Sequence, residues 1–168
     1  LSVVIPCYNE EKNLKLGMLE KVSDYLVKQK YVWEVIIVDD GSTDNSSNLV
    51  SKFIKNHLGF SLMKNPHQGK AATVISGMLK ASGQYILFSD LDQSTPIEEI
   101  EKILSWFKKD YDVVIGSRSS ERKGAPLTRR MIALGFMILR TLILGLSGIV
   151  DTQCGFKALE LSVAKKIF

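Results

Sequence analysis

Cysteine is scarce in this sequence, since Cys7 and Cys154 are the only two among 168 residues. They stand in unrelated contexts without the CxxC or Cys/His spacing of a zinc site, so the sequence indicates neither a disulfide framework nor structural zinc. Histidine is equally rare, and neither His57 nor His67 has a Ser, Cys or Asp partner at a suggestive spacing. We therefore expect a reducing, cytoplasmic compartment, and a surface or turn position for each histidine rather than a catalytic one.

The sequence also lacks an internal repeat and a low-complexity tract, and we expect no signal peptide in its first residues. It begins LSVVIPCYNEE, which predicts a strand and a turn and has neither the basic segment nor the cleavage site of a signal peptide. We therefore expect a chain trimmed from a longer protein, folded over residues 1–168 as one domain that is incomplete at its C-terminus. A content of 45% hydrophobic and 24% charged residues is sufficient for a real core.

A strong excess of charge is missing as well, because the net charge is only +4. This balance suits a nucleotide, a phospholipid surface or nucleic acid, but a solvated basic surface explains it equally well. Charge alone therefore selects no partner.

One long apolar run is present, MIALGFMILRTLILGLSGIV over residues 131–150. Its length meets the requirement of about 20 residues for a membrane span. Arg140 near its centre and the return to polar DTQCGFK argue against a span, because a charge in the middle of a membrane is costly. We expect a buried helix or one that lies along a membrane interface.

Five apolar segments of strand length, rich in Val and Ile, predict strands that are covered on both faces of a parallel sheet. Helical apolar patterns separate them at 14–26 and 50–58, and two further helices should follow Gly69 and Pro96. This alternation predicts an α/β fold, a Rossmann-like, mainly parallel sheet flanked by helices. The five expected strands are residues 2–6, 34–38, 60–64, 84–89 and 112–116.

Ligands of such sheets bind at the carboxyl ends of the strands, where polar clusters follow the expected strands here. In FSDLDQSTP, Asp90 and Asp92 directly follow a buried strand. On an extended backbone, positions i and i+2 point the same way, so both carboxylates could converge on Mg²⁺ or Mn²⁺ and the diphosphate of a nucleotide. The alternative is that one Asp caps the next helix while the other is solvated.

The clusters PCYNEE and DDGSTD, after the first two strands, offer groups for a nucleoside. Tyr8 could stack on a base, and Glu10 could bind ribose or uracil. Asp39 and Asp40 could accept hydrogen bonds from a base N–H or a ribose hydroxyl. The alternative is a pair of ordinary turns, in which Glu10 favours a helix dipole and Asp44 caps the next helix.

Two further segments could bind phosphate. NPHQGKAAT is not a P-loop, because Lys64 replaces its first glycine and Ala71 follows Lys70, but the helix opened by Lys70 could face an anion. A basic loop follows the fifth strand and suits phosphate capture, since Arg binds phosphate bidentately; a solvated loop is the alternative. Its candidate residues are Arg118, Arg129 and Arg130.

Taken together, VVIPCYNEE, VIIVDDGSTD, NPHQGKAA, GQYILFSDLD and VVIGSR, in this order across residues 3–118, resemble the family 2 inverting glycosyltransferases of the GT-A fold. The later segment RRMIALGFMILRTLILGLSGIVDTQCGFK resembles the branch that loads sugars onto polyprenyl or dolichyl phosphate. Within that branch, DTQCGFK looks most like the dolichyl-phosphate glucosyltransferases. Five motifs in order are far more specific than any one of them.

The resemblance implies transfer of a sugar, with glucose favoured, from a nucleoside-diphosphate sugar, with UDP favoured, to polyprenyl or dolichyl phosphate with inversion. Mg²⁺ or Mn²⁺ would offset the charge of the leaving diphosphate. It also implies a membrane surface as partner, at the cytoplasmic face, and no nucleic acid.

The same resemblance implies roles for individual residues. A phosphate acceptor needs no strong base, whereas a hydroxyl acceptor would need a carboxylate such as Asp151. The implied sets are, for the nucleotide-sugar, Pro6, Tyr8, Glu10, Asp39, Asp40, Lys70 and Asp90; for the metal, Asp90 and Asp92; for the acceptor phosphate, Arg118, Arg129 and Arg130; and for catalysis, Asp92, Asp151 and Arg118.

Two departures from the family pattern stand out. Mannosyl-transferring relatives read DADLQ, whereas here Ser94 occupies the last position and Gln93 is displaced by one. We therefore expect metal affinity or the donor sugar to differ. Relatives also continue past residue 168, so we expect part of the acceptor site beyond it. The alternatives are transfer to a saccharide hydroxyl in cell-surface polysaccharide synthesis, and a nucleotide-sugar-binding module without turnover. A nucleotidyltransferase should need a glycine-rich basic loop where CYNEE stands.

Overall fold

The structure, a computed structural model, describes residues 1–117, 135, 143, 145 and 151–168. Contacts divide the chain into two compact units, Leu1–Val114 with Gly155–Phe168, and Ile115–Cys154. The single domain expected over residues 1–168 stays a prediction. The apolar run 131–150 lies almost entirely outside the described residues, and no helix within the described ranges is long and apolar enough to span a membrane.

A six-stranded sheet with strand order β3-β2-β1-β4-β6-β5 forms the centre of the fold. β1 pairs in parallel with β2 and β4, and β2 pairs in parallel with β3, whereas β6 runs antiparallel to β4. The predicted α/β fold with a mainly parallel sheet is confirmed. The strands are β1 (Ser2–Cys7), β2 (Glu34–Asp39), β3 (Phe60–Lys64), β4 (Tyr85–Ser89), β5 (Val113–Ile115) and β6 (Phe156–Glu160).

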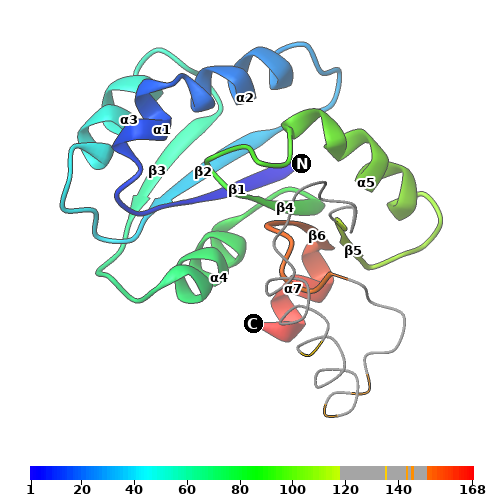
Figure 1. Cartoon of the computed structure of the whole chain (residues 1–168). Helices are drawn as coiled ribbons and strands as arrows, with labels where there is room; N and C mark the ends of the chain where they lie inside the picture. The colour runs from blue at the N-terminus through cyan, green and yellow to red at the C-terminus, as the bar shows by residue number, and fades with distance from the viewer. Residues whose placement is uncertain (118–134, 136–142, 144, 146–150) are drawn as a thin grey trace. The chain divides into compact units, whose positions relative to one another are not determined.

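Helices cover both faces of this sheet. Figure 1 shows α1, α2, α3 and α5 on one face, and α4 with α7 on the other. Because both faces are covered, the middle positions of the central strands are apolar, and Val3, Val4 and Ile5 of β1 are all 0% exposed. The helices are α1 (Glu11–Lys15), α2 (Met18–Leu26), α3 (Ser46–Ile54), α4 (Lys70–Lys80), the 3₁₀ turn η1 (Ile97–Glu99), α5 (Ile100–Phe107) and α7 (Leu161–Ile167).

The predicted helical patterns differ from the structure at two places. The pattern at 14–26 is split by Gly17, whose φ of 75° is left-handed and ends α1 before α2 begins. Leu58 lies beyond the end of α3 and is 94% exposed, so it does not belong to the buried face of that helix.

β6 is absent from the strands expected from the sequence. It ends at Glu160, directly before α7. The segment FKALE is too short for its period to identify a strand. Its conformation is set by pairing with β4, where Ala158 lies opposite Leu87.

α4 packs closely on the sheet at Gly77. A Cβ atom at this position would lie 2.5 Å from Val4 Cγ1 and 2.8 Å from Val38 Cγ2. Because such distances are too short for carbon atoms, only glycine permits this approach. The contact holds α4, and with it Lys70 in its first turn, beside the carboxyl ends of the central strands.

Gly77→Ala should therefore destabilise the fold, although alanine favours helix formation by up to about 1 kcal/mol over glycine. Overpacking against Val4 and Val38 costs roughly 1–3 kcal/mol, and we expect this cost to exceed the gain in helix propensity. Urea unfolding of the wild type and the variant measures the difference. Lys80→Ala, on an exposed position of the same helix, should change stability by less than about 0.5 kcal/mol. A more stable Gly77→Ala protein would contradict the proposed close contact.

Candidate functional site

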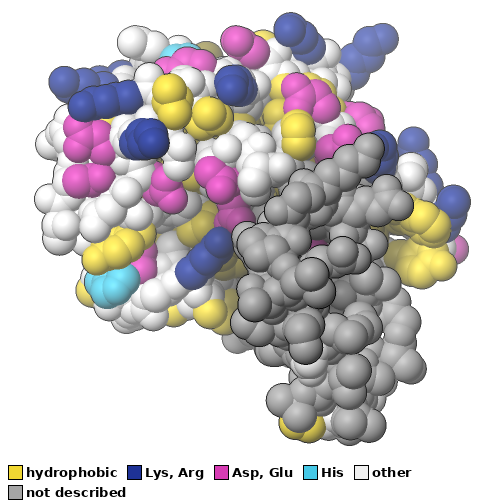
Figure 2. Space-filling view, viewed as in Figure 1, with side chains coloured by type: hydrophobic (Ala, Val, Ile, Leu, Met, Phe, Trp, Pro, Cys, Tyr) yellow, Lys and Arg dark blue, Asp and Glu magenta, His cyan; other side chains and the backbone are white. Residues whose placement is uncertain are grey.

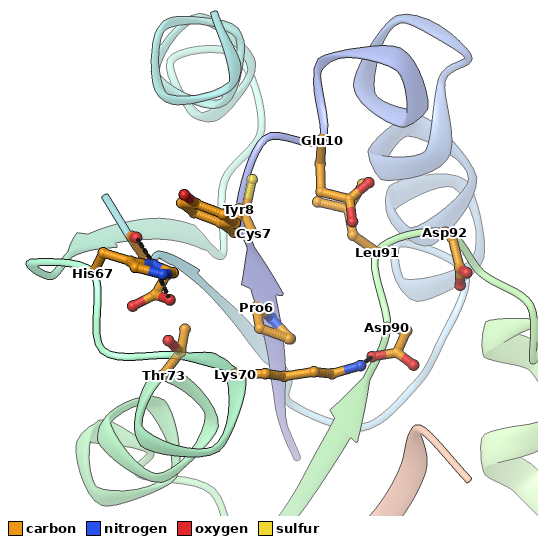
Figure 3. Close-up of a pocket in the computed structure, with 11 residues that line it drawn as sticks. Pro6, Cys7, Tyr8, Glu10, His67, Lys70, Thr73, Asp90, Leu91 and Asp92 are labelled. Carbon is orange, nitrogen blue, oxygen red and sulfur yellow. Dashed lines mark hydrogen bonds and ion pairs between the residues drawn. The ribbon is translucent and has the colours of Figure 1, made fainter. Parts of the chain in front are cut away.

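A pocket of about 280 Å³ lies where β1, β2 and β4 end, beside the first turn of α4. This is the edge of a parallel sheet at which ligands bind, and Figure 3 shows the side chains that line it. Those predicted from the sequence are Pro6, Tyr8, Glu10, Asp40, Lys70, Asp90 and Asp92. Those that the sequence analysis assigned to no site are Cys7, His67, Thr73 and Leu91.

The loops that follow β1 and β2 hold each other in place. Asn9 has a left-handed backbone with φ of 54°, and its amide oxygen accepts a hydrogen bond from Thr43 N–H at 2.9 Å. In return, Glu10 N–H donates to Ser46 Oγ at 2.8 Å. The polar groups of these turns therefore serve partly to join the two loops, and this fixes Tyr8 and Glu10 at the pocket wall.

The two acids that end β2 occupy different positions, although each is only 3% exposed. Asp40 lines the pocket, and its carboxylate accepts hydrogen bonds from Gln68 N–H at 2.9 Å and Gly69 N–H at 3.0 Å. Asp39 is not among the residues that line the pocket, and its Oδ1 accepts from Ser42 N–H at 3.0 Å. A direct contact between Asp39 and a nucleoside stays a prediction.

The Asp40 carboxylate fixes the loop that leads into α4. Burial acts to raise the pKa of Asp40, but the hydrogen bonds from Gln68 and Gly69, together with nearby His67, outweigh it and hold the pKa below its ordinary value. The carboxylate is therefore ionised at neutral pH, where it can hold both backbone N–H groups.

His67 contributes an aromatic ring that the sequence analysis placed at the surface or in a turn. The ring stacks on Tyr8 with centroids 4.3 Å apart and an interplanar angle of 21°, and His67 Nδ1 lies 2.9 Å from Asp40 Oδ2. Tyr8 is 42% exposed, so aromatic surface remains at the pocket on which a nucleobase can stack. His57, by contrast, stacks on Phe53 and is not among the lining residues.

Cys7 lies at the base of the pocket and is 1% exposed. Burial, reinforced by the Asp39 and Glu10 carboxylates, raises the pKa of its thiol to about 12. The thiol is therefore protonated at neutral pH, a state in which it is a poor nucleophile. Cys7 and Cys154 are both free and buried.

Asp90 is held between a backbone and an ammonium group. Lys70 Nζ lies 2.6 Å from Asp90 Oδ1, and Figure 3 shows the Lys70 side chain extended from α4 across to the end of β4. On the other oxygen, a Cβ added to Gly155 would lie 1.8 Å from Asp90 Oδ2, so the Gly155 backbone lies directly against it. Asp90 N–H also donates to Gly155 O at 3.2 Å.

Asp92 follows in a turn rather than on the extended backbone that the sequence analysis assumed, and that expectation is wrong. Gln93 N–H donates to Asp90 O at 3.2 Å, and Gln93 has a left-handed φ of 51°. Leu91 is 2% exposed and anchors the turn, while Asp92 Oδ1 accepts from Ser94 N–H at 2.9 Å. The Gln93 side chain donates to Asp90 O, and neither Gln93 nor Ser94 is among the described lining residues.

Asp90 and Asp92 offer oxygen ligands to a divalent cation from a single turn. No group of three or more His, Cys, Asp or Glu side chains suited to a metal ion is found among the described residues. A divalent ion bound by two carboxylates would need further oxygen ligands, such as water or phosphate oxygens. The Lys70 ammonium at Asp90 Oδ1 is a stand-in cation, because it shows that this carboxylate holds a positive charge. The two side chains therefore fit Mg²⁺ or Mn²⁺ bound together with a diphosphate.

The pocket is predominantly acidic. Figure 2 shows acidic side chains gathered across the middle of the face that carries these loops. Glu10, Asp40, Asp90 and Asp92 line the pocket, and Lys70 is the one Lys or Arg among the described lining residues. An anionic diphosphate can enter such a pocket only together with a cation.

The lining formed by the described residues does not include the remaining predicted residues. Arg118, Arg129 and Arg130 lie outside the described residues. Asp151 belongs to the second unit, where its Oδ1 accepts from Gln153 N–H at 2.9 Å. Their assigned roles stay predictions.

Comparison with known proteins gives a family match over residues 2–168, to Glycosyl transferase family 2. Dolichyl-phosphate beta-glucosyltransferases are similar over the whole chain: 36% identity for the protein of Saccharomyces cerevisiae and 33% for that of Homo sapiens, each covering 57% of the relative. A Trichomonas vaginalis relative, ALG5D, is 35% identical, with 55% of its length covered. The chain thus spans a little over half the length of these relatives.

Solved structures of glycosyltransferases share the fold. Mannosyl-3-phosphoglycerate synthase from Rubrobacter xylanophilus superposes with a TM-score of 0.72 at 15% identity, covering 96% of this chain and 53% of that one. The mannosyltransferase PcManGT from Pyrobaculum calidifontis, in complex with GDP-Man and Mn²⁺, gives a TM-score of 0.68 at 19% identity, covering 99% and 46%. At these identities the similarity establishes the GT-A fold alone.

Gly155→Ala should weaken metal binding, because the added methyl group would displace the Asp90 carboxylate. We expect the affinity for Mn²⁺ in the presence of UDP to fall by about 10-fold or more, as for other changes beside metal ligands. Calorimetry measures this affinity. In an Asp90→Ala background, Gly155→Ala should have little further effect; additive losses would contradict an action through Asp90.

Asp40→Asn should lower stability at neutral pH by weakening the hydrogen bonds to Gln68 and Gly69. Since the folded pKa of Asp40 lies below its ordinary value, the ionised carboxylate stabilises the fold above the unfolded pKa of about 3.9, and this contribution is lost as the pH falls through the folded pKa. The difference in unfolding free energy between wild type and variant should therefore shrink below about pH 4. Urea titrations at several pH values measure it, with the exposed Asp24→Asn as control. A difference that grows on acidification would contradict the assignment.

Proposed function

Because the chain belongs to glycosyl transferase family 2, we propose that it catalyses transfer of glucose from UDP-glucose to dolichyl phosphate or a related polyprenyl phosphate, with inversion at the anomeric carbon. The observation that supports this most is the 33–36% identity, across the entire chain, to curated dolichyl-phosphate beta-glucosyltransferases. The acidic pocket at the carboxyl ends of the strands adds independent support, since it suits a nucleoside diphosphate that enters with a divalent ion.

The donor is proposed to lie with its nucleoside in the loops that follow β1 and β2. Tyr8 offers a ring for the base, next to His67. Glu10 offers a carboxylate at the pocket wall, and the interlocked loops hold both groups before the ligand arrives. A preformed site of this kind binds without the entropic cost of ordering its loops.

The diphosphate is proposed to lie between α4 and the turn after β4. Lys70 stands at the start of α4, where the first backbone N–H groups and the ammonium both favour an anion. Asp90 and Asp92 would hold Mg²⁺ or Mn²⁺, which neutralises charge on the leaving UDP. Leu91, buried beneath the turn, keeps the two carboxylates on one rigid support.

The acceptor phosphate is already an anion at neutral pH, so it can attack the anomeric carbon without a general base. Instead, cations are needed that offset the electrostatic repulsion between the acceptor phosphate and the donor diphosphate. We assign this to Arg118, Arg129 and Arg130 from the sequence. A lipid acceptor also requires contact with a membrane surface, for which the apolar run 131–150 is the candidate, at the cytoplasmic face.

The direct test is a transfer assay. The intact protein is incubated with radiolabelled UDP-glucose, UDP-N-acetylglucosamine or GDP-mannose, with dolichyl phosphate and Mg²⁺ or Mn²⁺, and the lipid is extracted into organic solvent. We expect label in the lipid phase from UDP-glucose and its absence when EDTA is added. Label transferred to a saccharide acceptor, and none to lipid, would contradict the proposal.

Asp92→Asn tests the metal assignment in the same assay. Loss of one carboxylate ligand should lower turnover by at least about 100-fold, because metal ions contribute several kcal/mol to such transition states. The exposed Asp24→Asn variant, which removes the same charge at a residue outside the pocket lining, should retain full activity. Undiminished turnover in Asp92→Asn would exclude Asp92 as a ligand.

A further inference from the structure

In the Lys70–Asp90 ion pair, the Lys70 ammonium contacts a carboxylate that also fits a divalent ion, so the two cations compete for Asp90. Lys70 Nζ lies 2.6 Å from Asp90 Oδ1, and it also lies over the Phe88 ring at 5.5 Å from the centroid. Asp90 is one of the two side chains that fit a divalent ion. The ammonium therefore occupies a ligand position of that ion.

Asp90 cannot easily hold both cations. Its Oδ2 is covered by the Gly155 backbone, so closely that an added Cβ would lie 1.8 Å away. Oδ1 is then the oxygen left to face the pocket, and it is the oxygen that contacts Lys70. A divalent ion that binds Oδ1 would lie within a few ångströms of the ammonium, where repulsion between the two cations is strong.

The two partners differ in freedom of movement. The Asp90 side chain is 25% exposed and follows directly after β4, where the Gly155 backbone and the turn to Gln93 fix it. The Lys70 side chain is 60% exposed and has a flexible four-carbon stem. When the pair separates, it is Lys70 that moves.

We propose that Lys70 serves as an exchangeable counter-ion: it occupies Asp90 while the donor pocket is empty, and it transfers to the diphosphate oxygens when the nucleotide brings in the divalent ion. This inference rests on the proposed function, since it takes a nucleoside diphosphate and a divalent ion as ligands. In the empty pocket, Lys70 offsets the charge of Glu10, Asp40, Asp90 and Asp92. In the filled pocket the metal ion offsets the charge of the carboxylates. The Lys70 ammonium is then released from Asp90 and binds the diphosphate that entered with the metal ion.

The exchange couples the binding of metal to that of nucleotide. Without nucleotide, a metal ion must displace Lys70 into water and gains no phosphate ligands, so binding is weak. With nucleotide present, the displaced ammonium gains charge-assisted contacts with phosphate oxygens. Metal alone is thereby disfavoured at the site, and the complete metal–diphosphate pair is favoured.

Lys70→Met tests the exchange, because it removes the ammonium but keeps an unbranched apolar stem. Without nucleotide, we expect Mn²⁺ to bind this variant about 3- to 5-fold more tightly than the wild type, since a partly exposed ion pair no longer competes. UDP in the presence of saturating Mn²⁺ should bind about 10-fold more weakly, because a charge-assisted contact is lost. Electron paramagnetic resonance of free Mn²⁺ and calorimetry with UDP measure the two affinities.

Two control variants separate this effect from simpler causes. Lys80→Met removes the same charge at the far end of the same helix and should leave both affinities unchanged. Lys70→Arg keeps a cation at the position and should keep the weak Mn²⁺ affinity of the wild type. Urea unfolding establishes that each variant is folded, and the exposure of Lys70 predicts that all are.

The outcomes distinguish the exchange from the function on which it rests. If Lys70→Met binds Mn²⁺ no more tightly than the wild type without UDP, while Mn²⁺ still binds with UDP, the exchange is wrong and the metal site stands. If none of the proteins binds Mn²⁺ even with UDP, the metal-dependent function is wrong, and the exchange is wrong with it.

Discussion

The parallel pairing of β1 with both β2 and β4 is the constraint on which the site depends. In this register Cys7 lies opposite Asp39, and Val4 lies opposite Phe88, so the ends of three strands reach the same edge of the sheet. The loops that follow must then share one small region, where they meet the start of α4. The pocket is therefore a consequence of strand direction: parallel strands deliver every carboxyl end to one side, and the polar residues placed there by the sequence become neighbours.

Both backbone contacts and side-chain contacts stabilise this region. Gly77 brings α4 close to the sheet, and Gly155 brings the start of β6 against Asp90. Both positions exclude a side chain, because an added Cβ would meet Val4 and Val38 at Gly77 and the Asp90 carboxylate at Gly155. The buried Asp40 carboxylate then ties the loop before α4 to the end of β2. These contacts hold the pocket floor in place, whereas the Lys70 side chain at its surface is 60% exposed.

The excess of acidic side chains in the pocket is the property that connects this geometry to the proposed transfer. A site lined by four carboxylates repels a diphosphate, and it becomes a donor site only when cations balance it. In the proposed function, a divalent ion at Asp90 and Asp92 would supply that balance for the leaving group. The acceptor phosphate brings further negative charge, which the arginines assigned from the sequence would offset. The proposed transfer of a sugar between two phosphate-bearing molecules therefore requires cations that offset negative charge, rather than a group that transfers a proton.

The sequence by itself determined the α/β fold, the central strands and the order of the loops, because buried parallel strands require unbroken runs of Val and Ile and because turn residues follow them directly. It also indicated Asp90 and Asp92 as candidate functional residues, since two charged residues directly after a buried strand call for an explanation. Only the tertiary structure decided β6, whose five residues form a strand through pairing with β4. It likewise decided the position of His67 on Tyr8 and the contact of Gly155 with Asp90, which join residues distant in the chain. Such contacts leave no periodic signal, because they arise from the packing of separate elements and not from the local preference of any one of them.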